Sequence, residues 1–284
     1  MKDWVPVTRT LEDELTPWPV GAMRGLLDRD PVAEAGEHLP LGWHWLYFRQ
    51  ALRASRMGRD GHEARGDFLP PVDAPRRMWA GGWLRSHRPV ILGRGATLTS
   101  RVRSVKEKAG RSGPLVFVTV HHEIHQGGLS LEEEQTLVYR QKEAVGRAPR
   151  QNRPDSGPVD GGGAWVEQFT PTPLTLFQFS ALTYNAHRIH YDQPYVTQEE
   201  GYPALLVHAP LTALLLLDAA VRHGQTPVRY EYRALSPLFV SDPITLVGLG
   251  DGGVEARSPS GLTALSGRVF SQASIDGSAG GPRP

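Results

Sequence analysis

The segment Phe179–Leu217, FSALTYNAHRIHYDQPYVTQEEGYPALLVHAPLTALLLL, joins a dense group of polar side chains to an apolar helical run. Polar side chains in front of a buried apolar helix are costly unless they are satisfied, so such a group usually marks a functional site. Side chains that can take part in acid–base chemistry or hydrogen bonding lie within nine residues: Tyr184, Asn185, His187, His190 and Asp192.

A helix is expected over Ala209–Arg222. Its run Leu211–Leu217 is apolar on every side, so the helix should be buried within a sheet. Pro210 lies in the first turn, where its missing N–H costs nothing. The amides that open the helix, including that of Ala209, therefore remain unpaired at the positive end of the helix dipole, where a developing oxyanion could be held.

Both halves of the chain contain segments in which apolar and polar residues alternate, as in LVFVTVHHEI at 115–124. Alternation with a period of two indicates half-buried antiparallel strands. The expected strands are Ala96–Val105, Leu115–Ile124 and Glu134–Arg140 in the first half, and Val228–Ala234, Ile244–Gly250 and Leu262–Ser271 in the second.

In the first half, the Trp- and Gly-rich segment Met78–Trp83 precedes the strands, and we expect it to form the helix that corresponds to Ala209–Arg222. Each half then consists of one central helix followed by three or more long strands. A long helix wrapped by a curved antiparallel sheet is the hotdog arrangement. The pattern therefore predicts an α+β fold, a tandem double hotdog with two long helices.

Residues 146–163, GRAPRQNRPDSGPVDGGG, are rich in Gly, Pro and charge, which predicts an exposed linker. The expected organisation is an N-terminal hotdog at 1–145, this linker, a C-terminal hotdog at 164–276 and a frayed polar tail at 277–284. Only the second hotdog carries the pair Asn185 and His190. We therefore expect the first to be non-catalytic and to wall a substrate tunnel.

The composition excludes several classes of function. With 31 basic and 30 acidic residues the formal net charge is +1, which favours no nucleic-acid partner. The chain has no cysteine, which excludes disulfides, thiolate nucleophiles and cysteine-ligated metals. Charges lie where a signal peptide needs an apolar run, and Leu211–Leu217 is far shorter than the ~20 residues of a membrane span. We expect a soluble, cytoplasmic protein with no membrane partner.

His190 is the first candidate for chemistry, because imidazole changes charge near neutral pH and can take a proton from water or return it. The alternative is a buried structural histidine bonded to a backbone carbonyl. Asn185 does not titrate, but its amide can orient a water or a carbonyl. The alternative for Asn185 is a cap on a loop.

The histidines also raise the question of a metal, since imidazole suits zinc or iron. The spacing of His187, His190 and His208 matches no helical two-histidine motif, and prolines interrupt the segment. In HHEIH at 121–125, alternate residues of a strand face opposite sides, which favours a solvated or interface edge. We predict that no metal is bound.

Basic residues are concentrated between Arg85 and Arg111. One interpretation is a solvated strand face. The other is a binding site for a multiply phosphorylated group such as that of coenzyme A. The candidates for phosphate contacts are Arg85, Arg88, Arg94, Arg101 and Arg103.

The segments FSALTYNAHRIHYD (179–192) and EGYPALLVHAPL (200–211) resemble the C-terminal half of the MaoC-like double-hotdog hydratases and dehydratases. Residues 93–124 and 135–140 are similar to the N-terminal half of one branch of that family. This branch contains mitochondrial 3-hydroxyacyl-thioester dehydratases and bacterial mesaconyl-C4-CoA and itaconyl-CoA hydratases. The resemblance covers nearly the whole chain apart from the linker and tail.

Commoner members of the family carry Asp-x-Asn-Pro-x-His where this chain reads NAHRIH at 185–190. His190 matches the catalytic histidine, whereas Asn185 replaces the aspartate. The carboxylate that shares general-base duty is therefore missing from this segment. The His-Gly that supplies an oxyanion donor in those relatives is His208-Ala209 here, which keeps a backbone N–H.

The resemblance implies reversible hydration of an α,β-unsaturated acyl-CoA to a 3-hydroxyacyl-CoA, most of all itaconyl-CoA or mesaconyl-C4-CoA to citramalyl-CoA. Coenzyme A enters as part of the substrate, and no other cofactor is expected. Two alternatives stay open: a dehydratase of fatty-acid synthesis acting on a CoA or carrier-protein thioester, and a catalytically silent acyl-CoA-binding subunit. We also expect a homodimer, because hotdog sheets leave edges and an outer face that commonly pair.

The resemblance also suggests a role for each residue. His190 is the base, Asn185 helps to hold the water, and the amide of Ala209 binds the thioester oxyanion. A substrate carboxylate would need a fixed cation, for which arginine is suited, and the candidates are Arg233 and Arg188. The alternative is that either pairs with an acidic neighbour. The residues expected to bind substrate are Tyr184, His187, Arg188, His208 and Arg233.

Overall fold

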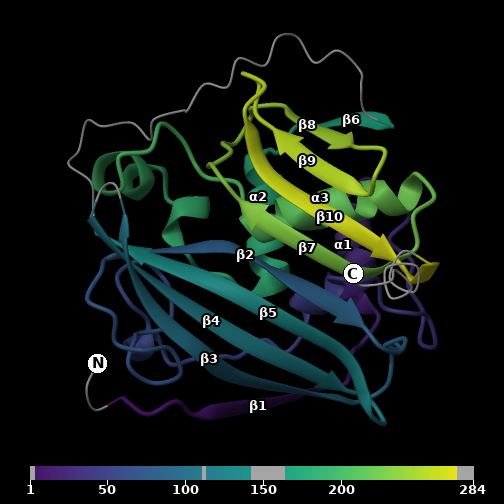
Figure 1. The fold of residues 1–284 in the computed structure, drawn as a ribbon, viewed down its shortest axis with the longest axis horizontal. Coiled ribbons are helices and arrows are strands. Elements are labelled where there is room, and N and C mark those ends of the chain that lie inside the picture. Colours follow the sequence, from purple (N-terminus) through teal and green to yellow (C-terminus); the bar gives the residue numbers. More distant parts are fainter. Residues whose placement is uncertain (1–3, 111–112, 142–163, 274–284) are drawn as a thin grey trace, which may run out of the picture.

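The computed structural model describes residues 4–110, 113–141 and 164–273. Ten strands form one antiparallel sheet in the order β1-β3-β4-β5-β2-β7-β10-β9-β8-β6 (Figure 1). The first half of the chain supplies β1 (Thr8–Asp13), β2 (Arg76–Ser86), β3 (Ala96–Gly110), β4 (Gly113–His125) and β5 (Leu129–Arg140). The second half supplies β6 (Trp165–Phe169), β7 (Pro227–Ala234), β8 (Ile244–Gly248), β9 (Gly253–Arg257) and β10 (Thr263–Ser271).

The two halves are joined through the pairing of β2 with β7, in which Gly81–Arg85 lies antiparallel to Arg229–Arg233. All six strands expected from alternation are present, within a few residues of the expected bounds. The short strands β1, β6 and β9 were not predicted. The expected linker at 146–163 and the tail at 277–284 lie outside the described residues.

The helices are α1 (Trp18–Leu26), α2 (Pro173–Thr183) and α3 (Ala209–Arg222). Short turns lie at η1 (Trp43–Leu46), η2 (Ala54–Arg56), η3 (Arg188–His190) and η4 (Tyr195–Glu199). The predicted bounds of α3 are confirmed. Among the described residues, no helix has both the length and the apolar character needed to cross a membrane.

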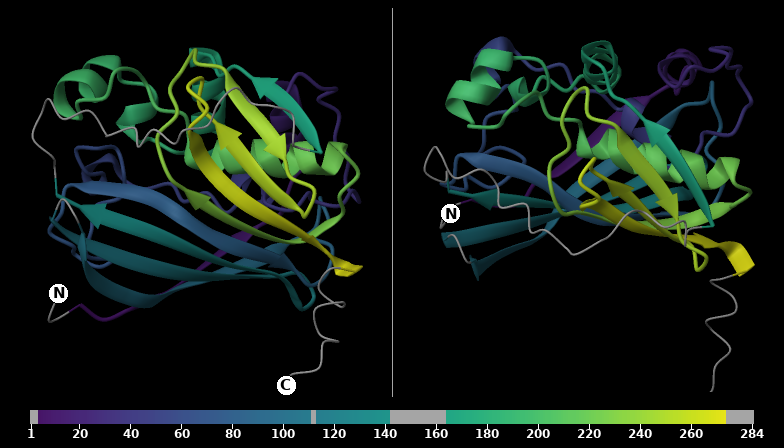
Figure 2. Two further views of the ribbon diagram at one scale, coloured as in Figure 1. Left: turned by 45° about the horizontal axis from the view of Figure 1, so that its top comes forward. Right: turned by 90° about the horizontal axis from the view of Figure 1, so that it is seen from above.

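Helix α3 lies in the hollow of the curved sheet, as the two views of Figure 2 show. Leu211 and Leu214–Leu217 are buried, as the all-apolar run predicted. The same core contains Val20 and Met23 of α1 and Trp43 of η1, which come from the first half. The two halves of the chain therefore share one hydrophobic core around one helix.

The expected helix at Met78–Trp83 is wrong, because this segment is part of β2. The longest helix among the described residues of the first half is α1, with nine residues. The tryptophan and glycines of the segment serve strand packing: the ring of Trp79 stacks on Tyr232 at 4.5 Å. A Cβ on Gly82 would lie 2.0 Å from the carbonyl oxygen of Glu134, so the close approach of β5 requires glycine there.

A buried polar network crosses the sheet beside α3. The carboxylate of Glu133, 1% exposed, lies 2.7 Å from Nε2 of His44 and accepts a hydrogen bond from Nε1 of Trp45 at 2.9 Å. Gln135 and Tyr232 also donate to it. Burial alone would raise the pKa of Glu133, but His44 and the other donors hold that pKa below its ordinary value. Three elements, η1, β5 and β7, thus depend on one ionised carboxylate.

We predict that Glu133→Ala lowers the free energy of unfolding by about 3–5 kcal/mol, because it leaves several buried donors without their acceptor. Glu134→Ala is the matched control, since Glu134 lies on the other face of β5 and pairs with the exposed Arg103. That pair should contribute at most about 1 kcal/mol. Urea denaturation of both variants measures the difference, and equal losses would contradict the assignment.

Candidate active site at the start of helix α3

His190 lies in η3 and is 7% exposed. Its Nδ1 lies 2.8 Å from the carbonyl oxygen of Leu206. A carbonyl can only accept, so Nδ1 carries the proton and Nε2 of the neutral ring keeps a free lone pair. Burial lowers the pKa of His190 to about 4, so the ring is neutral at pH 7. The hydrogen bond from Nδ1 to a backbone carbonyl, expected of a purely structural histidine, is therefore also what leaves Nε2 of His190 able to act as a base.

The start of α3 lies directly beside this ring. His208 is the N-cap residue of α3 and is fully buried, and its ring stacks on that of His190 at 3.6 Å. Nε2 of His208 lies 2.9 Å from the hydroxyl of Ser180 in α2. The amide of Ala209 has no hydrogen-bond acceptor among the described residues. The structure thus places the neutral ring of His190 against the residue that caps α3, next to Ala209 with its unpaired amide.

Asn185 shapes the loop that leads to η3. Its Oδ1 accepts a hydrogen bond from the backbone N–H of His187 at 3.0 Å. The side chain therefore caps the turn, as the structural alternative held. Its amide nitrogen makes no hydrogen bond to another described residue, so it is free to orient a water or a substrate oxygen.

A loop of the first half docks on this segment. The backbone N–H of Arg188 donates to the carbonyl of Asp60 at 2.9 Å. A Cβ at Gly61, whose φ is +86°, would lie 1.9 Å from the carbonyl oxygen of Ala186, so only glycine permits the contact. Arg76 of β2 also pairs with Glu200, at 2.9 Å. The loop before β2 is therefore fixed against the catalytic segment of the second half.

This docking places a carboxylate and a histidine beside the predicted site. Nδ1 of His62 lies 3.0 Å from Oδ2 of Asp60, and the ring of His62 lies 4.0 Å from that of His187. The ring of His187 in turn lies 5.5 Å from His190. Asp60, His62, His187 and His190 thus form a continuous row that ends at His208.

The charges in this row follow from burial and from its one carboxylate. Burial would raise the pKa of Asp60, but hydrogen bonding and charge from His62 hold it well below its ordinary value. Burial lowers the pKa of His62 to about 4, helped by the charge of Arg77 and opposed by Asp60. Burial also lowers the pKa of His187. At pH 7 the row therefore consists of neutral imidazoles and one carboxylate.

Asp60, His62 and His187 place one donor atom each within 4.8 Å of one another. Two imidazoles and a carboxylate form a donor set that a divalent transition metal accepts. Here, however, the carboxylate of Asp60 is already hydrogen-bonded to the ring of His62. We therefore assign Asp60 and His62 as an aspartate–histidine pair.

Arg77 of β2 is a cation on the inner face of the sheet beside this row. It lies opposite Tyr139 of β5, which is fully buried. Burial raises the pKa of the Tyr139 hydroxyl, and the charge and hydrogen bonding of Arg77 oppose that rise. The positive charge of Arg77 contributes to lowering the pKa of both His62 and His187. Among the described residues, no carboxylate forms an ion pair with Arg77.

Two of the expected substrate-binding residues are less available than the histidines. Tyr184 ends α2 and is 62% exposed. Arg188 makes an ion pair with Asp192 at 2.8 Å and lies over the ring of Tyr195. Both residues flank the row of histidines, but the cation of Arg188 is already engaged.

Arg233 is placed where it cannot meet the histidines. It alternates along β7 with Tyr232, which is buried against the core, so its side chain lies on the outer face of the sheet. The expectation that Arg233 holds a substrate carboxylate is therefore wrong. The resemblance suggested that Arg233 binds substrate, but the register of β7 directs its side chain outward.

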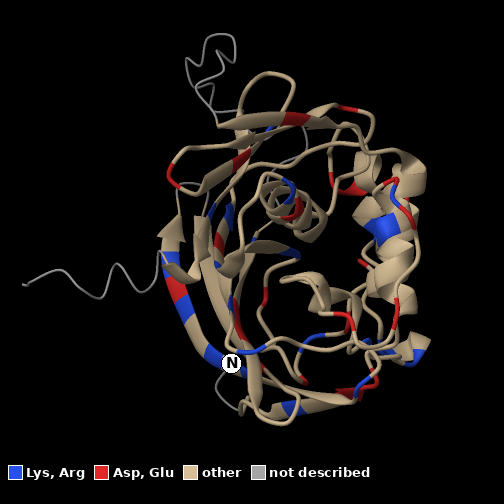
Figure 3. Cartoon of the chain, turned by 90° about the vertical axis from the view of Figure 1, so that its right-hand side faces the viewer, with Lys and Arg blue, Asp and Glu red and all other residues tan. Residues whose placement is uncertain are grey.

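Several of the basic residues between Arg85 and Arg111 also lie on the outer face of the sheet. Arg101 pairs with Glu123 at 3.0 Å and Arg103 pairs with Glu134, both on the outer face. Arg85 follows the buried Leu84 and also faces outward. Acidic and basic residues are interspersed over the strands (Figure 3). For Arg85, Arg101 and Arg103 the geometry therefore favours the interpretation as a solvated strand face. Arg88 and Arg94 are exposed between β2 and β3, and their contact with a phosphate stays a prediction.

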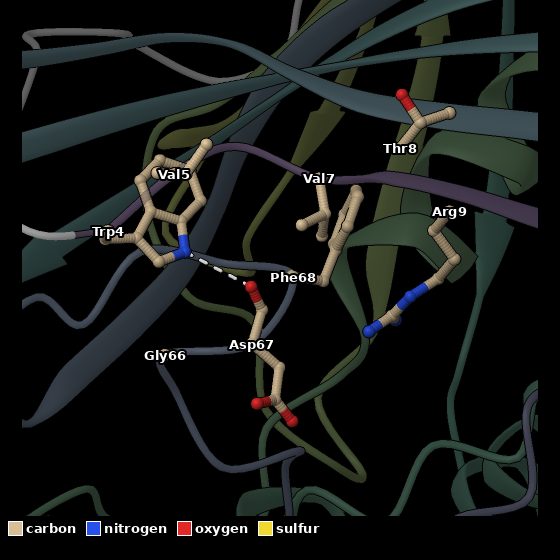
Figure 4. A pocket seen from close by; sticks show the side chains of 8 residues that line it. All are labelled: Trp4, Val5, Val7, Thr8, Arg9, Gly66, Asp67 and Phe68. Carbon is tan, nitrogen blue, oxygen red and sulfur yellow. Dashed lines mark hydrogen bonds between the residues drawn. The ribbon is translucent and has the colours of Figure 1, made fainter.

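A separate hollow of about 490 Å³ lies between β1 and the loop that precedes β2 (Figure 4). Its ionisable residues are Arg9 and Asp67. Arg9 is held by Glu63 at 2.7 Å, and the backbone carbonyl of Asp67 accepts from Nε1 of Trp4. The residues that line it include no histidine, and both of its ionisable side chains are engaged in ion pairs, Arg9 with Glu63 and Asp67 with Arg56, so we do not assign the chemistry to it.

Sequence reasoning missed Asp60, His62 and Arg77. The local sequence RDGHEAR at 59–65 has a Gly between an Asp and a His, which is a weak sign of a constrained polar loop. Nothing in it indicates the second half of the chain as its partner.

Comparisons with known proteins identify the family of the chain. Residues 42–240 match the family described as hydroxyacyl-thioester dehydratase type 2. The chain is 42% identical over 272 residues to mesaconyl-C4-CoA hydratase of Chloroflexus aurantiacus, covering 94% of this chain and 96% of that protein. It is 32% identical to the mitochondrial hydroxyacyl-thioester dehydratase type 2 of Schizosaccharomyces pombe, covering 72% and 76%.

Among solved structures, a Mycobacterium tuberculosis protein described as having a double hotdog fold superposes with a TM-score of 0.56. The identity is 16%, and 94% of each chain is covered, so this likeness concerns the fold. The predicted α+β double hotdog is confirmed. With most of its length matched by the family and by the two relatives, the chain belongs to the hydroxyacyl-thioester dehydratase type 2 family of MaoC-like double-hotdog proteins.

Proposed function

We propose that this protein is a carbon–oxygen lyase that reversibly hydrates an α,β-unsaturated acyl-CoA to a 3-hydroxyacyl-CoA. The observation that supports this most is the neutral ring of His190, held through Nδ1 by Leu206 beside the unpaired amide of Ala209. The relative from Chloroflexus favours mesaconyl-C4-CoA, an α,β-unsaturated thioester whose hydration gives citramalyl-CoA. Its isomer itaconyl-CoA has the double bond β,γ to the thioester, so it reaches the same product by this reaction after a proton moves from the α-carbon to the terminal methylene carbon.

In the proposed reaction, Nε2 of His190 takes a proton from a water that Asn185 helps to orient, while the water oxygen bonds to the β-carbon. The C=C π electrons move toward the thioester, and the N–H of Ala209 stabilises the oxyanion that develops there. His190 then returns that proton to the α-carbon and the thioester carbonyl reforms, so that H and OH have been added across the double bond and the ring is neutral again. His208 packs against His190 and keeps its ring in place.

The same machinery run in reverse removes water from a 3-hydroxyacyl thioester. The family name and the Schizosaccharomyces relative keep a dehydratase of fatty-acid synthesis as the second candidate. The two candidates differ in the acyl chain and in the carrier of the thioester, not in the residues that act.

We predict that His190→Gln lowers kcat/KM for hydration by roughly 10²–10⁴, the usual contribution of one general base. In the wild type, kcat/KM should fall as pH decreases through about 4, because the base works only while neutral and burial lowers the pKa of His190 to about 4. Absorbance of the enoyl thioester follows the reaction.

The matched control is His223→Gln at the other end of α3, where His223 pairs with Glu167. This variant should keep wild-type rates. An acid limb near pH 6.5, or an active His190→Gln variant, would contradict the assignment of the base.

For the substrate, we propose that Arg77 takes the role first expected of Arg233. Arg77→Met should lower kcat/KM for mesaconyl-C4-CoA and itaconyl-CoA by roughly 10–100-fold, as loss of a charge-assisted hydrogen bond predicts. It should leave crotonyl-CoA, which lacks the second carboxylate, little changed. Arg233→Met should change neither. Equal effects of Arg77→Met on all three thioesters would reject a contact between Arg77 and the substrate carboxylate. A preference of the wild-type protein for carrier-protein conjugates over CoA thioesters would favour the dehydratase.

We propose that no metal takes part. Overnight dialysis against EDTA and then metal-free buffer should leave kcat within about twofold, because the Asp60 carboxylate is committed to His62. Loss of activity that zinc or iron restores would show instead that Asp60, His62 and His187 bind a metal.

The quaternary structure and location are proposals of the same kind. A homodimer is supported by the exposed edge strands β1 and β6 and by the broad outer face of the sheet. A cytoplasmic location is supported by the absence of cysteine and by the bacterial relative.

A further inference from the structure

The proposed hydration moves a proton into a buried place. When His190 accepts a proton from water, an imidazolium forms where burial already disfavours charge. Arg77 adds a second positive charge nearby, and the motif that would hold an aspartate has Asn185 instead. Without a carboxylate, this cationic state would be strongly destabilised.

We infer that Asp60, from the first half of the chain, supplies the carboxylate that the second-half motif lacks and acts through His62 as a positioning residue. The inference rests on the proposed function. Asp60 is hydrogen-bonded to Nδ1 of His62 at 3.0 Å, and the rings of His62, His187 and His190 follow one another. It is the carboxylate of that row among the described residues.

The loop is built to hold Asp60 in this place. Oδ1 of Asp60 accepts from the backbone N–H of His62 at 3.0 Å, while Oδ2 lies against the ring of the same residue. Its own carbonyl accepts from Arg188. Both carboxylate oxygens are therefore oriented by the loop, and the loop is fastened to the catalytic segment.

Two consequences follow for the histidines. Since the carboxylate accepts the Nδ1 proton of His62, Nε2 of His62 is left as an acceptor toward the row. The negative charge also offsets the cation that forms on His190. With the Asp60 carboxylate present, Arg77 and the imidazolium give the site a net charge of +1; without it, the net charge would be +2. The first half is then part of the catalytic unit and not only the wall of a tunnel.

The charged and titratable groups around His62 come from several elements. The charged ones are Asp60 in its own loop, Arg65 beyond it and Arg77 of β2, and the neutral titratable ones are His187 and His190 of the second half. Asp60 is the negative member. Its neutralisation makes every proton uptake in the row harder, so the acid limb of kcat/KM should move to lower pH.

The test compares Asp60→Asn with Glu63→Gln in the full-length protein. Glu63 lies in the same loop, is similarly half-buried and pairs with Arg9, which the site does not use. With whichever of the enoyl-CoA thioesters the wild type hydrates, Asp60→Asn should lower kcat at least ~10-fold with KM little changed, as removal of a carboxylate that orients a histidine does elsewhere. Glu63→Gln should keep the wild-type rate and pH profile.

His62→Gln and the double variant Asp60→Asn/His62→Gln complete the cycle. If Asp60 acts through His62, the double variant should be no slower than His62→Gln alone. Circular dichroism and thermal unfolding of each variant show that the loop has folded. Should Asp60→Asn fail to fold, a His62→Gln rate equal to that of Glu63→Gln would overturn the inference, and a loss of at least ~10-fold would support it.

The outcomes separate this inference from the proposed function. A wild-type protein that hydrates none of the thioesters rejects the function itself. The second outcome rejects only the role of Asp60. In it the wild type is active and His190→Gln is not, but Asp60→Asn matches Glu63→Gln in rate and pH profile. A shift of the acid limb to lower pH with Asp60→Asn supports it, because loss of a merely structural contact would not move that limb.

Discussion

The rest of the structure depends on the burial of α3, a helix that is apolar on every side. Such a helix cannot leave one face to water, so it must be covered all round. The strands of the second half cover one side, and α1, η1 and α2 complete the core on the other. Because part of that cover comes from the first half, the two hotdogs cannot be independent units: they share the helix that both enclose.

That constraint also decides where the chemistry lies. A helix enclosed along its length has open ends, and the N-terminal end of α3 offers an unpaired amide at the positive end of its dipole. Pro210 in the first turn fits there without losing a hydrogen bond. The rings of His208 and His190 stack at this end, and the loop around Gly61 docks on the segment before η3, at Ala186 and Arg188. The burial of α3 therefore also determines where the proposed base, His190, lies.

Two carboxylates of the first half, the buried Glu133 and the half-buried Asp60, are each held against a histidine, but for different reasons. Glu133 satisfies donors from η1, β5 and β7 at the centre of the sheet, so it fixes how the strands meet. Asp60 lies at the edge of the core, in a loop against the catalytic segment. The same chemical pair stabilises the fold in one place and serves the proposed site in the other.

The sequence by itself determined the features that depend on neighbours along the chain. It determined the bounds of α3 and the long strands, and it pointed to His190 and to the open amide of Ala209, because helical and strand periods and helix-start chemistry are local. Only the tertiary structure decided the rest. Met78–Trp83 is a strand because its glycines meet β5 and β7, and Arg233 faces outward because the pairing of β7 sets its register. Asp60, His62 and Arg77 reach His187 because the shared core folds one half onto the other, a contact that no local pattern records.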